Sequence, residues 1–387
     1  SYGEVGNDQI GGDRFLYLPS SYGAASDSGV NKYNFGLASN PYTSLMIVEN
    51  KIGNPDLTWE KAKKMNVGVD INLFNNCLTA SFDIFKEKRN NILANRSTSP
   101  MIIGANLPAY NFGEMENRGW EMDLNFRHHI QDFHYWARFN YPGCCGISGA
   151  GAYGISVTSF TDTGRRKNQF FGLIFDGYYN SWEEINALDR PKSSWSGNQL
   201  QPGDVKYIDV NQDGVIDDYD MVPIGYTPVP EIIYGFSFGA QYKGFDFSIL
   251  FQGADNVSIK YFGRSMWPFA KGEESAKSLI KERWTQERYE AGEKITLPRL
   301  SLNPNGETDH NYRPSTLWIR DASYLRLKNL EVGYTFTGGF VKRLNLNSVR
   351  LYFNGSNLFT WTDVVDLDPE APSRSGNVEI NTYPLQK

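Results

Sequence analysis

The stretch DVNQDGVIDDYD at residues 209–220 carries oxygen-bearing side chains at the spacing of a calcium-binding loop. Donors occupy loop positions 1, 3, 5, 9 and 12, and Gly214 stands at position 6, where such loops turn sharply. We expect a structural Ca²⁺ ion here, with the aspartate at position 12, in place of the usual glutamate, as its weakest ligand. The alternative is an acidic surface turn held by its own Asx side chains. The predicted ligands are the side chains of Asp209, Asn211, Asp213, Asp217 and Asp220 and the carbonyl oxygen of Val215.

Other residues that could do chemistry form no catalytic group. GAGAYG at 149–154 has the glycine spacing of a nucleotide-binding loop, but no hydrophobic strand precedes it. His128 and His129 are adjacent on an expected strand, so they point to opposite faces and cannot chelate one metal ion. The sequence contains no GxSxG, HExxH or Walker motif. We therefore predict that the chain is not an enzyme.

Four tryptophans lie in segments that we expect to be long loops. An exposed aromatic ring can stack on the face of a sugar, so these residues are weak candidates for substrate contact, although packing within a loop is the more frequent role of such a ring. They are Trp182, Trp195, Trp267 and Trp318.

Composition narrows the class of protein. The 387 residues carry a net charge of −6 with no basic block, which argues against a nucleic-acid partner. Aromatic residues make up 14% of the chain and there are 37 glycines, a mixture that favours strands and turns. Three cysteines cannot form a disulfide framework. No apolar run is long enough for a membrane helix, but strands of a membrane barrel are only half apolar and escape that test.

Alternation of apolar and polar residues predicts four β-hairpins. In one of the strands, Val67, Val69 and Ile71 alternate with Gly68 and Asp70. Each strand is roughly ten residues long, which matches a tilted membrane-spanning strand. The expected pairs are 66–73 with 78–84, 120–127 with 133–141, 232–242 with 245–252, and 330–336 with 349–354.

The connections are short within hairpins and long between them, at about 88–116, 143–230 and 257–322. That bias is typical of an outer-membrane barrel with periplasmic turns and extracellular loops, whereas a soluble sandwich turns every 8–12 residues. We therefore predict an all-β fold, an antiparallel transmembrane β-barrel whose apolar face touches lipid and whose polar face lines the lumen. Aromatic residues near strand ends are expected at the membrane interfaces, namely Trp120, Tyr135, Trp136, Tyr141 and Tyr242.

Six stretches in order resemble the SusC/RagA family of TonB-dependent outer-membrane transporters of Bacteroidetes. They are GNPDLTWEKAKKMNVGVDINLF, NRGWEMDLNF, FGLIFDGYY, GDVKYIDVNQDGVID, PEIIYGFSFGAQYKGFDFSILFQG and LWIRDASYLRLKNLEVGYTF. The similarity runs over nearly the whole chain, and YPGCCGISGAGAYGIS at 141–156 departs from it. The resemblance implies that residues 1–387 are the C-terminal part of a 22-stranded barrel. The plug domain and the last strand are missing, so we expect a piece of a longer protein.

The resemblance also implies a function in the outer membrane of a Gram-negative bacterium. Members of this family take up oligosaccharides or peptides, with a SusD-like lipoprotein as a lid and TonB acting through the plug, in a dimer of transporter–lid pairs. The alternative is a calcium-stabilised surface adhesin or glycan-binding β-protein. An apolar face exposed around the strands favours transport, whereas an apolar face buried between two sheets favours the alternative.

Overall fold

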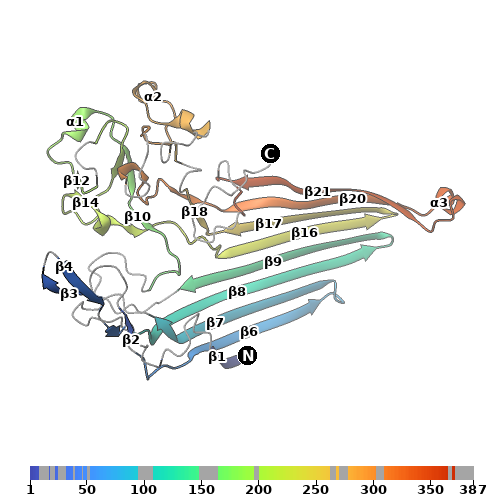
Figure 1. Cartoon of the computed structure of the whole chain (residues 1–387). Coiled ribbons are helices and arrows are strands. Elements are labelled where there is room, and N and C mark those ends of the chain that lie inside the picture. Colours follow the sequence, from blue (N-terminus) through green and yellow to red (C-terminus); the bar gives the residue numbers. More distant parts are fainter. Residues whose placement is uncertain are drawn as a thin grey trace.

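A large antiparallel sheet dominates the computed structural model (Figure 1). The structure describes residues 1–7, 17, 22–24, 32–37, 40–45, 47–49, 53–94, 108–147, 164–195, 200–261, 267–269, 278–301, 309–364 and 368–370. Nine strands follow one another in the order β1-β6-β7-β8-β9-β16-β17-β20-β21. Their bounds are β1 Tyr2–Asn7, β6 Glu60–Leu73, β7 Leu78–Ala94, β8 Tyr110–Ile130, β9 Phe133–Ile147, β16 Ile232–Tyr242, β17 Phe245–Asp255, β20 Tyr324–Phe336 and β21 Val349–Thr362.

The four predicted hairpins are all present, as β6–β7, β8–β9, β16–β17 and β20–β21. Their turns lie together at one end of the sheet, and the long connections leave from the other end (Figure 1). The two-residue turn between β16 and β17 has Lys243 at φ 45° and Gly244 at φ 89°, the positive φ values that such a hairpin turn needs. The strand β1, which pairs with β6, was not predicted by the alternation.

Register places the apolar residues of eight strands on one face. One row across the sheet reads Ile71, Ala80, Leu124, Phe139, Phe236, Phe251, Leu327 and Phe359. The adjacent row, on the other face, reads Asp70, Ser81, Asp123, Asn140, Gly235, Gln252, Arg326 and Thr360. On the apolar face, Ile84 is 54% exposed and Phe353 is 64% exposed. An apolar surface of this extent requires an apolar environment.

Aromatic side chains form two belts across the apolar face. Near the loop end, Tyr141 stacks between Trp120 and Tyr234, with ring centroids 4.8 and 6.5 Å away. Near the turn end, Phe133 lies 5.4 Å from Tyr135 and 6.1 Å from Tyr242. From Tyr234 to Tyr242 the strand β16 covers nine residues, within the 9–11 that a tilted membrane strand needs.

One expected member of these belts lies elsewhere. Trp136 pairs with Gly239 on the polar face, so the expectation that it sits at the membrane interface is wrong. A β-carbon at Gly239 would come within 2.4 Å of the Trp136 ring, and only glycine leaves room for it. The strand alternates faces at every residue, and the neighbouring Tyr135 takes the apolar side instead.

Several strands are longer than the alternation predicts. β7 runs to Ala94 and β8 begins at Tyr110, so the first long connection covers only 95–109. Charged residues interrupt the apolar pattern at these strand ends, but they pair across the ladder. Lys64 lies 3.5 Å from Glu87, Lys86 lies 3.1 Å from Glu116, and Lys88 lies 3.1 Å from Glu114. The other connections run over 148–231 and 256–323.

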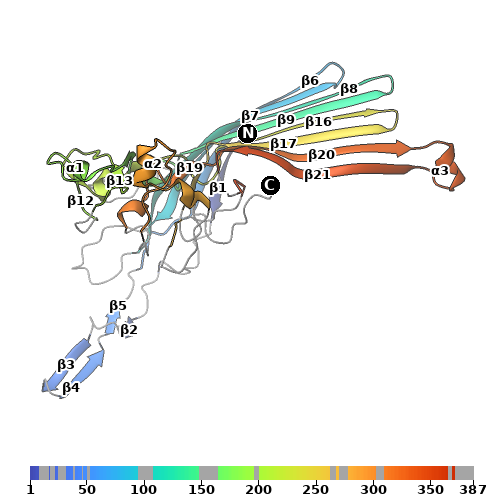
Figure 2. The same ribbon diagram turned by 90° about the horizontal axis from the view of Figure 1, so that it is seen from above.

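The described residues of these two connections, which we call the loop layer, fold at one end of the sheet with a core of their own (Figure 2). None of the helices in the described residues combines the length and apolarity needed to cross a membrane. The loop layer contains β10 Phe171–Gly172, β11 Phe175–Tyr178, α1 Trp182–Ile185, β12 Lys192–Ser193, β13 Val205–Tyr207, β14 Val215–Ile216, η2 Asp218–Asp220, β15 Val222–Pro223, β18 Ser258–Lys260, η4 Ser278–Glu282, α2 Gln286–Glu290, η6 His310–Tyr312 and β19 Ile319–Asp321. Outside it are β2 Tyr22–Ala24, β3 Lys32–Leu37, β4 Asn40–Leu45, β5 Ile47–Glu49 and, in the β20–β21 turn, α3 Gly339–Arg343.

Two neighbouring positions on β7 test the assignment of the faces. In the intact protein, we expect Ala80→Arg, on the apolar face between Leu78 and Phe82, to lower the free energy of unfolding by about 2 kcal/mol. The matched change Ser81→Arg lies on the polar face beside Asp70 and Asp123, and we expect a change below about 1 kcal/mol there. Urea unfolding in lipid vesicles measures both. Equal losses would contradict the assignment.

Candidate functional site: the polar sheet face and the loop layer

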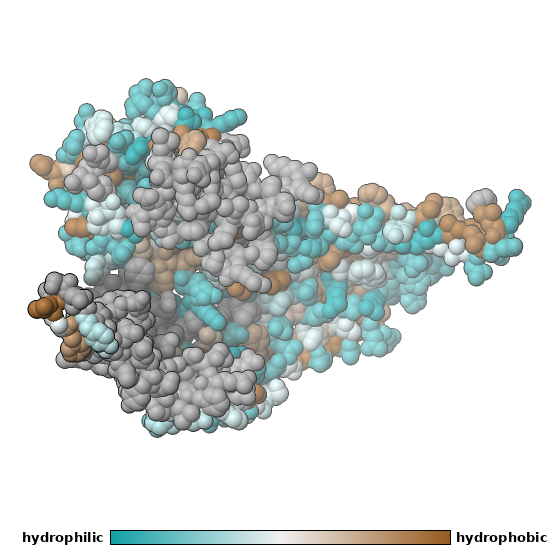
Figure 3. Space-filling model, in the orientation of Figure 1, coloured by the Kyte–Doolittle hydropathy of each residue, from teal (hydrophilic) through white to brown (hydrophobic). Residues whose placement is uncertain are grey.

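Hydrophilic side chains cover the polar face between the turn end and the loop end, as Figure 3 shows for the side of the sheet turned to the viewer. Cross-strand contacts order this surface. Arg138 donates to Asp123 at 2.8 Å, Ser81 donates to Asp70 at 2.7 Å, and Arg350 Nε donates to Asp246 at 3.2 Å. These groups are partly exposed, so they offer both donors and acceptors to water or to a polar molecule.

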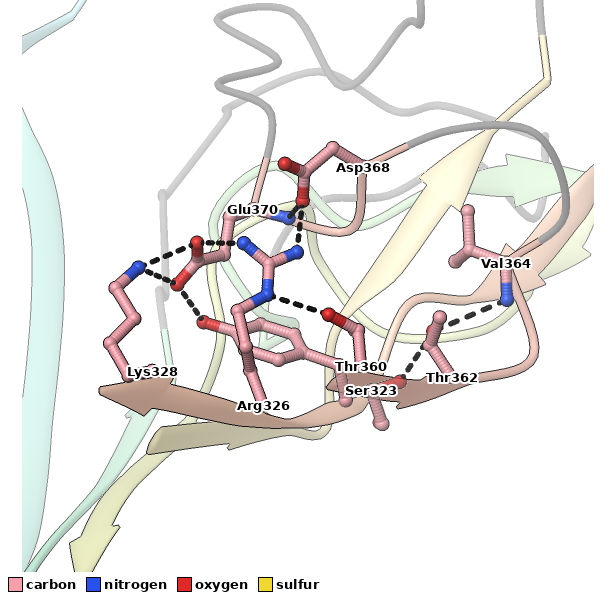
Figure 4. A network of polar contacts seen from close by, with 9 residues as sticks. Ser323, Arg326, Lys328, Thr360, Thr362, Val364, Asp368 and Glu370 are labelled. Carbon is pink, nitrogen blue, oxygen red and sulfur yellow. Dashed lines mark hydrogen bonds and ion pairs between the residues drawn. The ribbon is translucent and has the colours of Figure 1, made fainter. Parts of the chain in front are cut away.

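At the loop end of this face, Arg326 of β20 anchors a distant segment of the chain (Figure 4). The arginine is 2% exposed, and its guanidinium donates to Thr360 at 2.9 Å, to Asp368 at 2.5 Å and to Glu370. Lys328 also donates to Glu370, at 2.8 Å. A buried charge is tolerated only when it is fully paired, and this network pairs it. It therefore holds residues 368–370 against the polar face.

Two of the four candidate tryptophans are core residues. Trp267 is 4% exposed and Trp318 is 2% exposed, and both rings pack on Tyr312, at 5.0 and 5.4 Å. The indole of Trp318 donates to the carbonyl oxygen of Asn311 at 2.9 Å. Rings buried in this way have no free face for a substrate, so the expectation of substrate contact is wrong for these two.

The other two candidates differ in access. The ring of Trp195 is half-buried, and the Arg313 guanidinium lies 3.9 Å from its centroid. Trp182 is 55% exposed at the start of α1, where Ser181 caps the helix. Trp182 is therefore the candidate whose ring is open to a ligand.

Hydrogen bonds to its own Asp and Asn side chains shape the first half of the acidic loop. Asp209 accepts hydrogen bonds from the backbone N–H groups of Gln212, at 2.7 Å, and Gly214, at 2.8 Å. The side chain of Asn211 donates to Asp213 at 3.0 Å. Gly214 has a φ of 83°, which provides the sharp turn. These contacts gather Asp209, Asn211 and Asp213 on one loop.

Asp220 takes a different place from its predicted partners. It is fully buried, and its carboxylate accepts from the backbone N–H groups of Val210, at 2.8 Å, and Asp217, at 2.9 Å. Its oxygens therefore hold the two ends of the loop together. Across the part of the chain that the structure describes, no three or more His, Cys, Asp or Glu side chains are arranged to hold a metal ion.

A buried polar network that the sequence did not reveal joins three segments of the loop layer. The His310 Nε2 lies 2.7 Å from the carbonyl oxygen of Val205, and its Nδ1 lies 2.9 Å from the Ser193 hydroxyl. Because a carbonyl only accepts, Nε2 donates and the neutral ring satisfies both contacts. Burial lowers the pKa of His310 below its ordinary value of 6.5. The histidine is thus kept neutral inside the loop layer.

A sheet with one exposed apolar face between aromatic belts, one polar face and long connections at a single end defines an outer-membrane β-barrel wall. The family model described as "TonB dependent receptor-like, beta-barrel" matches residues 17–358, and the chain belongs to this family. The predicted all-β barrel fold and outer-membrane location are thereby confirmed. The expectation that the chain is not an enzyme is confirmed as well, because the family consists of receptors and transporters.

Curated relatives agree with the family assignment. The chain is 27% identical over 384 residues to TonB-dependent receptor P26 of Formosa agariphila, covering 94% of the chain and 37% of the relative. It is 25% identical over 393 residues to TonB-dependent receptor SusC of Bacteroides thetaiotaomicron, covering 99% of the chain and 36% of that protein. The chain thus spans a little over a third of the length of these relatives.

Among solved structures, the chain is similar to the RagAB peptide importer in its "open-open" state. The TM-score is 0.67 at 22% sequence identity, covering 99% of the chain and 38% of that structure's chain. The match to the "closed-closed" state of the same importer has a TM-score of 0.65. These likenesses confirm the fold, and the family model and the similarity to SusC confirm the predicted resemblance to the SusC/RagA type.

Lowering the pH should destabilise the loop layer. Between the lowered pKa of folded His310 and its ordinary value of 6.5, the unfolded state binds more protons, so the free energy of unfolding falls as the pH drops below about 6.5. Hydrogen-exchange protection factors of loop-layer peptides at pH values of about 7.5 and 5.5 measure this. His310→Gln should flatten the pH dependence. The control His134→Gln, on the sheet, should retain it, and an unchanged dependence in His310→Gln would refute the assignment.

Proposed function

We propose that the chain supplies barrel wall and mouth loops to a TonB-dependent importer of oligosaccharides or peptides. The observation that carries this proposal is the sheet, whose continuous apolar face lies opposite a polar face lined with paired carboxylates and guanidiniums. Such a wall separates lipid from a wet lumen through which a hydrated cargo can pass. A calcium-stabilised adhesin would bury its apolar face between two sheets, and the exposed Ile84 and Phe353 argue against that.

A SusD-like lipoprotein is the proposed partner at the loop end, and TonB the proposed partner on the turn side through a plug. The resemblance to SusC and to the RagAB peptide importer supports both partners. The loop layer offers a preformed surface for a lid, because it has its own core of buried aromatic and aliphatic residues. A dimer of transporter–lid pairs is the proposed assembly.

Uptake in the native host tests the proposal. Deletion of the gene should abolish uptake of either labelled oligosaccharides or labelled peptides, and an uncoupler of the proton-motive force should abolish the same uptake in the wild type. The cargo class whose uptake is lost identifies the substrate. Normal uptake of both classes by the deletion strain would exclude the proposed function.

Trp182 should contribute to cargo binding. Loss of its exposed ring in Trp182→Ala should weaken cargo binding by roughly fivefold, the effect of losing about 1 kcal/mol at a contact residue. Leu188 provides a matched control, because it is fully exposed in the same loop layer but has no ring to stack on a ligand. Equal affinities of the wild type and Trp182→Ala for the cargo identified by uptake would remove Trp182 from the substrate site.

We further propose that a structural Ca²⁺ ion closes the acidic loop. Asp209, Asn211 and Asp213 are its central ligands, with the carbonyl oxygen of Val215 and the side chain of Asp217 completing the set. The hydrogen bonds from Gln212 and Gly214 to Asp209 support the proposal, because they already wrap the backbone around the carboxylates. Asp220 was predicted as a further ligand. In this proposal its carboxylate also holds the two ends of the loop together.

Calorimetric titration of the purified protein with calcium tests this loop. Asp213→Ala should weaken binding by about tenfold or more, because it removes a charged ligand. Asp189→Ala removes an exposed carboxylate elsewhere in the loop layer and should leave binding unchanged. The absence of chelator-reversible binding to the wild-type protein would refute the proposal.

A further inference from the structure

Beyond the aromatic belt at the loop end, the lipid-facing side of the sheet carries a band of basic residues. We call it the basic band, and it consists of Lys61, Lys63, Lys86, Lys88 and Arg118. Lys86 pairs in register with Met65 on one side and Arg118 on the other, and Lys63 pairs with Lys88. Like charges directly opposite one another destabilise a sheet, so such a band calls for counter-charges.

The basic band continues the apolar face without a change of side. Lys86 follows Ile84 on β7 by two residues, and Arg118 precedes Trp120 on β8 by two residues. Side chains two apart on a strand point to the same face. The cations therefore stand just outside the belt that marks the edge of the hydrocarbon region, at the height of the lipid headgroups.

Local counter-charges do not neutralise the basic band. Lys61, Lys86 and Lys88 each have one carboxylate nearby, at 3.8, 3.1 and 3.1 Å. The lysine side chains of these pairs remain 55%, 52% and 46% exposed, so the pairs are weak and can exchange partners. Lys63 stands opposite Glu4 in the register, but neither it nor Arg118, both exposed, forms an ion pair among the described residues. A net positive surface thus stands on a chain whose total charge is −6.

We propose that the basic band binds the phosphate groups of lipid headgroups in the leaflet at the loop end. Three features favour a lipid over another anionic ligand. The band is continuous with the lipid-facing apolar surface, it lies on an open sheet face, and it is an extended row of cations. Clusters of lysine and arginine at a membrane edge attract anionic headgroups in this way. Phosphate binding would fix the depth at which the tall strands β7 and β8 sit in the membrane.

Native mass spectrometry of the intact protein with added lipid A tests the proposal. The double variant Lys63→Gln/Arg118→Gln should bind lipid A roughly tenfold more weakly than the wild type, given the attraction of each cation to an anionic surface. The control Lys342→Gln/Arg343→Gln removes the same charge from α3, at the turn end, and should bind as the wild type does. The same lipid after removal of its phosphates should bind as weakly to the wild type as lipid A does to the double variant.

Three results would overturn the inference. They are unchanged lipid A binding by Lys63→Gln/Arg118→Gln, equal binding of the dephosphorylated lipid, and displacement of lipid A by millimolar inorganic phosphate, which would indicate a site for free anions. The inference rests on the membrane placement of the sheet and not on the cargo. Uptake measured on the same variants therefore separates its failure from failure of the proposed function.

Discussion

Backbone hydrogen bonding between neighbouring strands is the constraint on which the rest of the structure depends. In hydrocarbon an unpaired N–H or C=O group costs several kcal/mol, so a sheet crosses a membrane only when every strand has two neighbours. Within the described residues, β1 and β21 each have one neighbour. In a membrane, the outer edges of these two strands would therefore need partners as well. Side chains must then alternate between lipid and lumen, and both the apolar row through Ile71 and the polar row through Asp70 follow from that pairing.

The loop layer meets its hydrogen-bonding needs in a different way. Its strands are too short for ladder pairing to supply a partner for every buried backbone group. Buried polar side chains supply the missing partners. Asp204, 3% exposed, accepts from Asn311 at 2.8 Å and forms an ion pair with Arg299 at 2.6 Å, and Asn311 accepts from the backbone of Val205 at 2.9 Å. These contacts join segments about a hundred residues apart. They make the loop layer a folded unit, and its shape follows from side-chain pairing as much as from apolar burial.

The local alternation of apolar and polar residues predicts the sheet. The features that it does not predict depend on contacts between residues far apart in the sequence. A period of two is visible in any strand with one lipid-facing side, so all four hairpins could be found. Charges at the ends of β7 and β8 break the pattern, so the sequence predicts loop there, and only the folded structure shows that Lys88 meets Glu114. Arg326 and Glu370 are 44 residues apart, and nothing local joins them. Exposed Trp182 and buried Trp318 look alike in sequence, because burial depends on what folds over a ring.

The strands differ in height in a way that shapes the mouth. β8 has 21 residues and β16 has 11, and both reach the same level at the turn end, where Phe133 pairs with Ile130 and with Tyr242. The extra residues of β8 all stand at the loop end, where they add about 30 Å along the strand. A level rim would offer the same docking surface to a molecule after any rotation about the barrel axis. A rim with one high side lacks that symmetry, so it would favour a single orientation of a large molecule that docked there.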